Sequence, residues 1–295
     1  MSTKKSIIIQ LIGGLGNQLF QICFGLRMAR QTGFNLKFDT SSYCKDPFGR
    51  SSFLQVILPN AEEITITQEI KKKLYIINEA TSSRLEPWFL GSKANVPNEI
   101  EYIYFTGYWQ DSRYVLNNET DLIFERLSSL FKSKINNEIL EKLSSKKSLA
   151  VHIRRHDYKH HGLVLLDYYF ASIRSIIDNF GDHDIFLFSD EPNFVKFVFN
   201  QRKIKYNFIN TKSDLFDLYV MCLANKHIIA NSTYSWWGAR LNNSSLTIAP
   251  NSWSLMHTPS KYLLPNEWIK VDNVLEANAF PIEEELMKII NKEII

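Results

Sequence analysis

The sequence predicts an α/β protein with two Rossmann-like halves that face each other across a cleft. Three observations lead to this fold class. The isoleucine-rich run Ser6–Ile12 ends in glycines, which is typical of a strand buried on both faces of a parallel sheet. Short apolar strands then alternate with helical patterns in two separate series. The polar, lysine-rich stretch Ser144–Ser148 separates the two series, so we expect two parallel sheets, with ligands at the carboxyl ends of their strands.

The first series begins as a strand, a glycine turn, a helix and a second strand. Apolar residues recur at near-helical spacing from Asn17 to Arg30, and Gly33 is placed to end that helix. Strands are predicted at Phe34–Phe38 and Tyr102–Tyr108, and helical patterns follow from Asp111 to Lys147. Residues 40–98 show no regular pattern. We therefore predict an N-terminal domain over residues 1–147.

The second series repeats the alternation over residues 148–281, which we predict to be the C-terminal domain. The predicted strands are Leu149–Ile153, Ile185–Phe188, Tyr206–Ile209, His227–Ala230 and Leu246–Ala249. The predicted helices are Asp167–Phe180, Asn193–Asn200, Ser213–Leu223 and Ser235–Leu241. An amphipathic helix is predicted for the tail, residues 282–295.

Composition excludes several classes of protein. Hydrophobic residues make up 45% of the 295 residues, enough for a large core, and the net charge of +3 demands no nucleic-acid partner. The three cysteines have no zinc-site spacing and fit a reducing compartment. The apolar start is interrupted by Gln10 and glycines, so it resembles a buried strand more than a signal peptide, and no apolar run is long enough to span a membrane. We expect a cytoplasmic protein, in loose contact with the inner membrane at most.

A glycine-rich turn, Gly13–Gln18, follows the first strand. Gly14 and Gly16 let the backbone come close to a ligand at the start of a helix. A dinucleotide fingerprint needs a third glycine where Leu19 stands, so an NAD(P)-dependent oxidoreductase remains only an alternative. Asn17 and Gln18 place amide groups at this edge, where a sugar hydroxyl could use them.

A dense polar cluster, His152–Tyr158, follows the central strand of the second series. Two adjacent arginines are costly to order unless an anion meets them, and a guanidinium matches a diphosphate through paired hydrogen bonds. Because neighbouring residues of an extended chain point to opposite faces, we expect one of Arg154 and Arg155 on a phosphate and the other on a structural carboxylate. Asp157 is either that ion-pair partner or a general base.

Two further segments end predicted strands with polar groups. Ser189, Asp190 and Glu191 could accept hydrogen bonds from a ribose or a guanine, although helix caps look the same. The second segment combines hydroxyl and amide side chains with a helix start and resembles a phosphate cradle; its candidates are Asn231, Ser232, Thr233 and Ser235. Trp236 and Trp237 are expected in the core, and Gly238 is expected to allow close helix packing.

No metal-binding signature accompanies these segments. The sequence has no DxD motif in a form suited to a metal diphosphate, no HExxH and no GxxxxGK[ST]. We therefore expect no metal and no other cofactor. Arginine and helix N-termini would then stabilise a leaving diphosphate.

Four motifs together resemble the galactoside α-1,2-fucosyltransferase family, glycosyltransferase family 11. They are GGLGNQLFQ, HIRRHDY, FSDE and NSTYSWWGARL, in this order over most of the chain. The resemblance implies a modified GT-B-like glycosyltransferase fold and an inverting, metal-independent transfer of L-fucose from GDP-L-fucose to a β-galactoside, as in bacterial O-antigen. The acceptor would be a glycan, for which a lipid-linked form would fit, and no nucleic acid would be involved.

The resemblance also implies roles for individual residues. His152 would lie near the guanosine, Arg154 would bind the β-phosphate and Arg155 would support it. Asp190 or Glu191 would serve the nucleoside. Phosphate contacts would come from Ser232 and Thr233, and the acceptor side would be lined by Gly14, Gly16 and Asn17. One departure is His156, because the family usually has glycine between the arginines and the aspartate.

The mechanism that follows is a direct displacement. Arg154 takes up charge on the departing GDP, a galactose hydroxyl attacks from the opposite face, and Asp157 is the candidate general base. Asn17 could instead orient the acceptor, with a phosphate oxygen as the base. The alternatives are a fucosyltransferase of another linkage or acceptor, the NAD(P) enzyme, and a sugar-binding protein without catalysis. The oligomeric state is not predicted.

Overall fold

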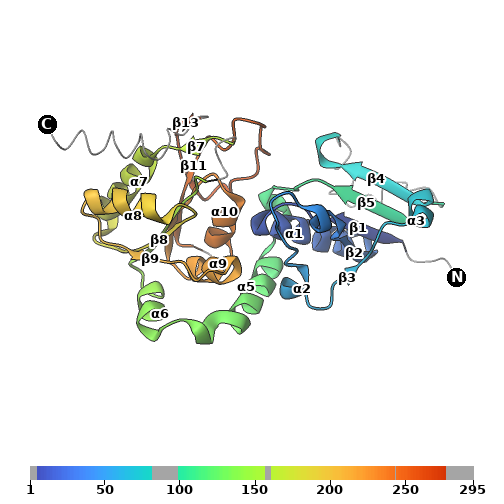
Figure 1. The fold of residues 1–295 in the computed structure, drawn as a ribbon, viewed down its shortest axis with the longest axis horizontal. Helices are drawn as coiled ribbons and strands as arrows, with labels where there is room; N and C mark the ends of the chain where they lie inside the picture. Colours follow the sequence, from blue (N-terminus) through green and yellow to red (C-terminus); the bar gives the residue numbers. More distant parts are fainter. Residues whose placement is uncertain (1–4, 82–98, 157–160, 243, 277–295) are drawn as a thin grey trace. The chain divides into compact units, whose positions relative to one another are not determined.

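The computed structural model describes residues 5–81, 99–156, 161–242 and 244–276 (Figure 1). The chain divides into two compact units, residues 1–126 and 127–295, and α5 runs through the division. The tail helix predicted at 282–295 lies outside the described residues. Within the described ranges, no helix has both the length and the apolar character that crossing a membrane requires.

The first unit contains a five-stranded sheet in the order β3-β2-β1-β5-β4, in which every pair is parallel. The elements in chain order are β1 (Ser6–Gln10), α1 (Leu15–Thr32), β2 (Asn35–Asp39), η1 (Ser41–Lys45), α2 (Leu54–Ile57), β3 (Glu62–Glu63), α3 (Gln68–Lys72), β4 (Leu74–Asn78), η2 (Glu79–Thr81), β5 (Tyr102–Thr106), η3 (Ser112–Tyr114) and α5 (Asn117–Phe131). Strands β3 and β4 lie in the region without a regular pattern and were not predicted.

Central strand β1 shows why an uninterrupted apolar run predicts this position. Ile7, Ile8 and Ile9 are all fully buried, because the strand is covered on both faces. Helix α1 packs against β1 and β2 at Gly25, where an added Cβ would lie 2.7 Å from Ile9 Cγ1. The helix ends where predicted: Gly33 adopts the left-handed conformation, with φ of 70°, and its N–H donates to the Ala29 carbonyl.

The second unit contains a six-stranded parallel sheet in the order β12-β11-β10-β6-β8-β9. Its elements are η4 (Lys132–Lys134), α6 (Asn137–Leu143), β6 (Ser148–Ile153), β7 (Leu163–Val164), α7 (Leu166–Phe180), β8 (Asp184–Ser189), α8 (Pro192–Gln201), β9 (Asn207–Phe208), α9 (Asp214–Cys222), β10 (Lys226–Ile228), α10 (Thr233–Arg240), β11 (Leu246–Pro250), β12 (Ile269–Val271) and β13 (Leu275–Glu276). Strands β7 and β13 form a separate antiparallel pair. The predicted α/β class with two parallel sheets is confirmed.

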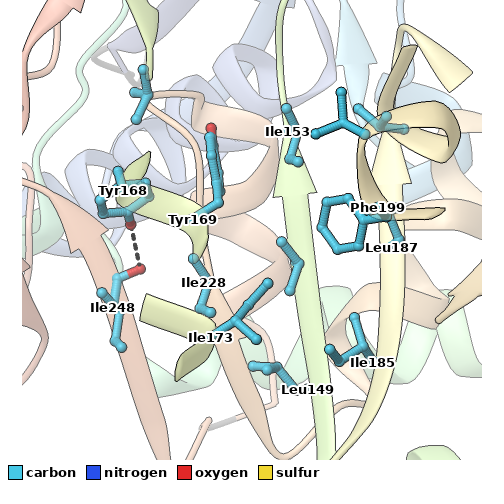
Figure 2. Close-up of a cluster of buried hydrophobic side chains, with 14 of the residues drawn as sticks. Leu149, Ile153, Tyr168, Tyr169, Ile173, Ile185, Leu187, Phe199, Ile228 and Ile248 are labelled. Carbon is cyan, nitrogen blue, oxygen red and sulfur yellow. Dashed lines mark hydrogen bonds between the residues drawn. The ribbon is translucent and has the colours of Figure 1, made fainter. Parts of the chain in front are cut away.

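One part of the core of this unit lies between its sheet and helices α7 and α8. Figure 2 shows Tyr169 and Ile173 of α7 and Phe199 of α8 facing the side chains of the central strands. The Tyr168 hydroxyl lies 3.0 Å from the carbonyl oxygen of Ile248 (Figure 2) and 3.0 Å from that of Ile229. It thereby joins the carboxyl end of β10 to β11, next to the segment that carries the candidate site.

Candidate active site

The strand order of the second sheet creates a switch point between β6 and β10. From β6 the chain adds β8 and β9 on one side, and it then returns to add β10, β11 and β12 on the other side. This is the Rossmann strand order, in which ligands bind outside the carboxyl ends of the strands at the point of reversal. The predicted residues His152–Arg155 end β6, and residues 231–235 follow β10, so the fold brings both segments to this place.

Arg154 places a cation at this edge. Its side chain is 28% exposed, and its Nε lies 3.1 Å from Asp190 Oδ2 at the end of β8. Asp190 also accepts hydrogen bonds from the backbone N–H groups of Arg155, at 2.9 Å, and His156, at 3.1 Å. Asp190 therefore fixes the loop after β6 and one side of the guanidinium. Its carboxylate has partners within the protein, and the nucleoside contact expected of Asp190 stays a prediction.

Arg155 has a different role from its neighbour. Its side chain is 5% exposed, its Nε lies 3.2 Å from Glu191 Oε2, and its guanidinium lies over the Phe194 ring, 4.1 Å from the centroid. Both arginines thus meet a carboxylate, and Arg155 with Glu191 is the more buried pair, while the phosphate contact expected of the other arginine stays a prediction. The backbone N–H of Glu191 donates a 3.1 Å hydrogen bond to Ser189 Oγ, which fixes Glu191 just beyond β8.

His152 lies at the end of β6 as a neutral, buried side chain. Burial, with a smaller contribution from the Arg154 guanidinium, lowers the pKa of His152 from 6.5 to about 3. Its ring lies 5.5 Å from the ring of Tyr234 in the first turn of α10. Among the described residues its Nδ1 atom has no hydrogen-bond partner. The imidazole therefore adds no positive charge beside Arg154 at neutral pH.

The start of α10 supplies an anion-favouring helix N-terminus at the same switch point. Ser232 is the N-cap, and its Oγ accepts a hydrogen bond from the Tyr234 N–H. Thr233 opens the helix, and the buried Ser235 hydroxyl contacts the Ala230 and Ser232 carbonyl oxygens. The predicted cradle is thus a capped helix start whose hydroxyl groups are largely engaged within it.

Asn231 joins three loops at this edge. Its fully buried Nδ2 donates to the carbonyl oxygens of Gly162 and Trp253, each at 2.9 Å. Within the described part of the chain, its Oδ1 atom has no hydrogen-bond partner. Asn231 therefore fixes the loops that follow β6 and β11 around the start of α10.

Asp157 and His156, the two residues after the arginines, differ in what the structure describes of them. Asp157, the candidate base, lies outside the described residues, so its role stays a prediction. The non-glycine residues with positive φ in the described ranges are Trp109, Lys203 and Lys212, so His156 carries no left-handed strain in place of glycine.

The packing predictions for α10 are confirmed. Trp236 and Trp237 are fully buried, and Trp236 Nε1 donates to the Leu263 carbonyl. A Cβ added to Gly238 would collide with the Sδ and Cγ atoms of Met221 in α9. The two tryptophans are core residues, and the glycine allows α9 and α10 to pack closely.

The glycine turn of the first unit is built from its own polar side chains. Gly13 has a φ of 81°, and Gly14 is the N-cap of α1, with Gly16 buried in the first turn. Gln18 is fully buried: its Nε2 donates to the Gly13 and Ser51 carbonyls, and its Oε1 accepts from the Phe53 N–H. Gln18 therefore fixes the turn and has no surface to offer a ligand, unlike the acceptor contact that the sequence predicted.

Asn17 does lie at the surface of the first unit. It is half-buried, and its Oδ1 accepts a hydrogen bond of 3.0 Å from Nε2 of Gln110, beyond the end of β5. Gln21 joins the same two strand ends, because its Oε1 accepts from the Ile12 N–H and its Nε2 donates to the Gly107 carbonyl. This edge is also a switch point, since β5 returns to pair with β1 after β2, β3 and β4 have been placed.

Sequence reasoning missed several residues at these two edges. Tyr234 stands inside one of the four motifs but received no role. Gln21, Gln110 and Glu79 were not singled out. The run Gly107–Gln110 had a usable signal, because it places a glycine, aromatic rings and an amide directly after a predicted strand.

Comparison with known proteins supports one family. Residues 88–272 match the model described as "Glycosyl transferase family 11". An α-1,2-colitosyltransferase of Escherichia coli is 30% identical, over 90% of this chain and 99% of that protein. The O-antigen biosynthesis glycosyltransferase WbnK of Escherichia coli is 28% identical, over 88% of this chain and 99% of that protein.

A solved structure supports the fold. The NodZ α-1,6-fucosyltransferase co-crystallized with GDP aligns with a TM-score of 0.52 and 16% identity, over 81% of this chain and 92% of that chain. This likeness agrees with the fold class expected from the four motifs.

Proposed function

The chain belongs to glycosyl transferase family 11, and we propose that it transfers L-fucose from GDP-L-fucose to the 2-hydroxyl of a β-galactoside. The reaction would invert the anomeric centre and need no metal ion. The acceptor would be part of a bacterial glycan, and the similarity to an O-antigen biosynthesis glycosyltransferase supports this choice.

The observation that carries the proposal is the partly exposed Arg154 at the switch point of the second sheet. The start of α10 lies close to the same strand end, since the ring of Tyr234 in its first turn is 5.5 Å from the ring of His152 in β6. A guanidinium and a helix N-terminus together suit a diphosphate. The NodZ fucosyltransferase was co-crystallized with GDP, which supports a guanine nucleotide as the donor here.

In the mechanism we propose, Arg154 acts on the leaving group. The bond between the fucosyl anomeric carbon and the β-phosphate oxygen breaks, its electrons go to GDP, and Arg154 with the α10 N-terminus stabilises the added charge. Asp190 keeps the guanidinium in place before the donor arrives, so little reorganisation is needed. The acceptor hydroxyl forms the new bond to the same carbon. Its proton goes to a base, for which Asp157 remains the candidate.

A second candidate donor follows from the similarity to an α-1,2-colitosyltransferase. Colitose is L-fucose without its 3-hydroxyl group, so both sugars suit the same linkage chemistry. A site that hydrogen-bonds the 3-hydroxyl would strongly reject the deoxy sugar, whereas an apolar pocket would discriminate weakly. The ratio of kcat/KM for GDP-fucose and GDP-colitose decides between the two donors.

The experiment incubates the protein with each GDP-sugar and a panel of β-galactosides in EDTA, followed by linkage analysis of the product. We expect an α-1,2-linked product. Arg154→Ala should lower kcat/KM for the donor about 10²–10³-fold. Arg174→Ala, which removes an exposed arginine on α7, is the matched control and should keep wild-type turnover. Near-normal turnover of Arg154→Ala would refute the role of Arg154, and loss of activity in EDTA would refute metal independence.

A further inference from the structure

The turn after β5 in the first unit, residues 107–110, has an unusual backbone. Gly107 has a φ of 144°, and Trp109 has a φ of 54°. A bulky residue with positive φ is in a rare and strained backbone conformation. Such conformations persist only where the surroundings impose them, and they occur preferentially at functional sites.

Two groups impose this conformation. The fully buried Trp109 ring stacks on Phe24, with centroids 4.1 Å apart and planes 5° apart. The Glu79 carboxylate, just beyond β4, accepts a 2.7 Å hydrogen bond from the Tyr108 N–H through Oε2. Gly107 is needed here, because an added Cβ would overlap the Glu79 side chain.

Glu79 acts on the whole turn. Burial raises the pKa of Glu79, and hydrogen bonds from the backbone N–H groups of Trp109, Tyr108 and Gln110 act against this shift. The nearby carboxylate of Asp111 also raises the pKa, but Asp111 is itself paired with Arg113 at 2.8 Å. Glu79 thus joins the end of β4 to the turn that follows β5.

The turn presents neutral polar groups and one exposed aromatic ring. Gln110 Nε2 donates to Asn17 Oδ1 at 3.0 Å. The Tyr108 side chain is 44% exposed, and its Cε1 atom would lie 3.3 Å from a Cβ on Gly13. An open tyrosine ring therefore lies beside the glycine turn, next to a pair of hydrogen-bonded amides.

We propose that Tyr108, Gln110 and Asn17 form the subsite for the neutral galactoside acceptor, and that Glu79 is a positioning residue that holds their turn in place. This inference rests on the proposed function. A sugar ring has an apolar face, which suits an aromatic ring, and hydroxyl groups, which suit amides that can donate and accept. No residue of this trio carries a charge, which matches an uncharged ligand.

The test is steady-state kinetics with GDP-fucose and lactose, a β-galactoside. Tyr108→Ala should raise the KM for lactose roughly threefold to tenfold, while Tyr108→Phe, which keeps the ring, should stay within about twofold of wild type. Gln110→Ala should also raise the KM for lactose. Glu79→Gln should raise it about tenfold or more, because the amide replaces one acceptor oxygen with a donor that faces N–H groups. The KM for GDP-fucose should change little.

Phe180→Ala is the matched control, because Phe180 is a 51% exposed aromatic residue at the end of α7 in the second unit. A wild-type protein that transfers no sugar would refute the proposed function itself. If the wild type transfers fucose but Tyr108→Ala and Gln110→Ala both keep its KM for lactose, the subsite is wrong. If Glu79→Gln is the only variant that changes kinetics, raises the KM for both lactose and GDP-fucose, and also lowers the Tm, then the role of Glu79 is structural. The KM of Gln110→Ala for lactose then decides whether the subsite is correct.

Discussion

The buried ion pair between Arg155 and Glu191 leads to a quantitative prediction about stability. The two side chains are 5% and 9% exposed, so neither charge is well solvated. Replacing Arg155 with Met removes the guanidinium and leaves the Glu191 carboxylate buried without its ionic partner. Loss of one member of such a pair costs about 3–5 kcal/mol. The contact with the Phe194 ring is lost as well.

The double variant Arg155→Met/Glu191→Leu removes both charges and fills the space with apolar groups. Replacing a whole buried pair in this way is often neutral or stabilising, so we expect its stability to lie within about 1–2 kcal/mol of wild type. The two substitutions should therefore be strongly non-additive, with a coupling energy of about 2 kcal/mol or more.

Urea unfolding followed by tryptophan fluorescence measures this effect. Four of the six tryptophans, at positions 236, 237, 253 and 268, belong to the second unit, so the signal reports mainly on the unit that contains the pair. Lys142→Met is the control, because it breaks the exposed pair between Lys142 and Glu138 on α6 and should leave the midpoint unchanged. Additive effects of the two core substitutions would show that the ions do not depend on each other, and the reasoning would fail.

Three further predictions concern the second unit. Burial lowers the pKa of His152 to about 3 and of His227 to about 4, so below pH 6.5 the unfolded chain binds more protons than the folded chain. The contribution of each histidine to the free energy of unfolding should be complete above pH 6.5 and about 2 kcal/mol lower at pH 5. Urea midpoints at pH 7.5 and pH 5 would show this loss. An unchanged midpoint between these pH values would contradict it. Asp190→Asn leaves one acceptor oxygen for the groups that Asp190 now holds, so kcat/KM for the donor should fall about tenfold, and wild-type kinetics would show that this carboxylate does not position Arg154. Gly238→Ala should cost about 1–3 kcal/mol through its collision with Met221, which thermal unfolding would detect; no change in Tm would mean that α9 and α10 move apart freely.

Most elements of the second unit could be predicted because their signals are local. A mostly apolar run marks β6, Ser213 caps α9 as expected, and Gly33 ends α1 in the first unit. Strand β3 could not be predicted, because it consists of two exposed glutamates. Strand β4 had a usable signal that was missed, since its apolar run Leu74–Ile77 is as long as the run that predicted a strand at Ile185–Phe188.

The sequence predicted which residues lie at the candidate site better than it predicted what each of them contacts. The local motif shows that Arg154 and Arg155 follow a strand, and the alternation of an extended chain predicts that their side chains point in opposite directions. It does not show that Glu191 pairs with Arg155 or that Asp190 holds two backbone N–H groups, because these contacts join β6 to a neighbouring strand about 35 residues later. Gln18 was assigned to a ligand because its amide looks available in the sequence, whereas the fold uses both ends of that amide internally.

The central place of β6 has a consequence for synthesis of the protein. Residues Ser148–Ile153 leave the ribosome long before β10, their second neighbour in the sheet, has been translated. During that interval one edge of an almost entirely apolar strand has no hydrogen-bonding neighbour, and such edges recruit strands of other chains. Fragments that stop before residue 226 should therefore collect in inclusion bodies, whereas in chains that extend past β10 this edge of β6 is paired.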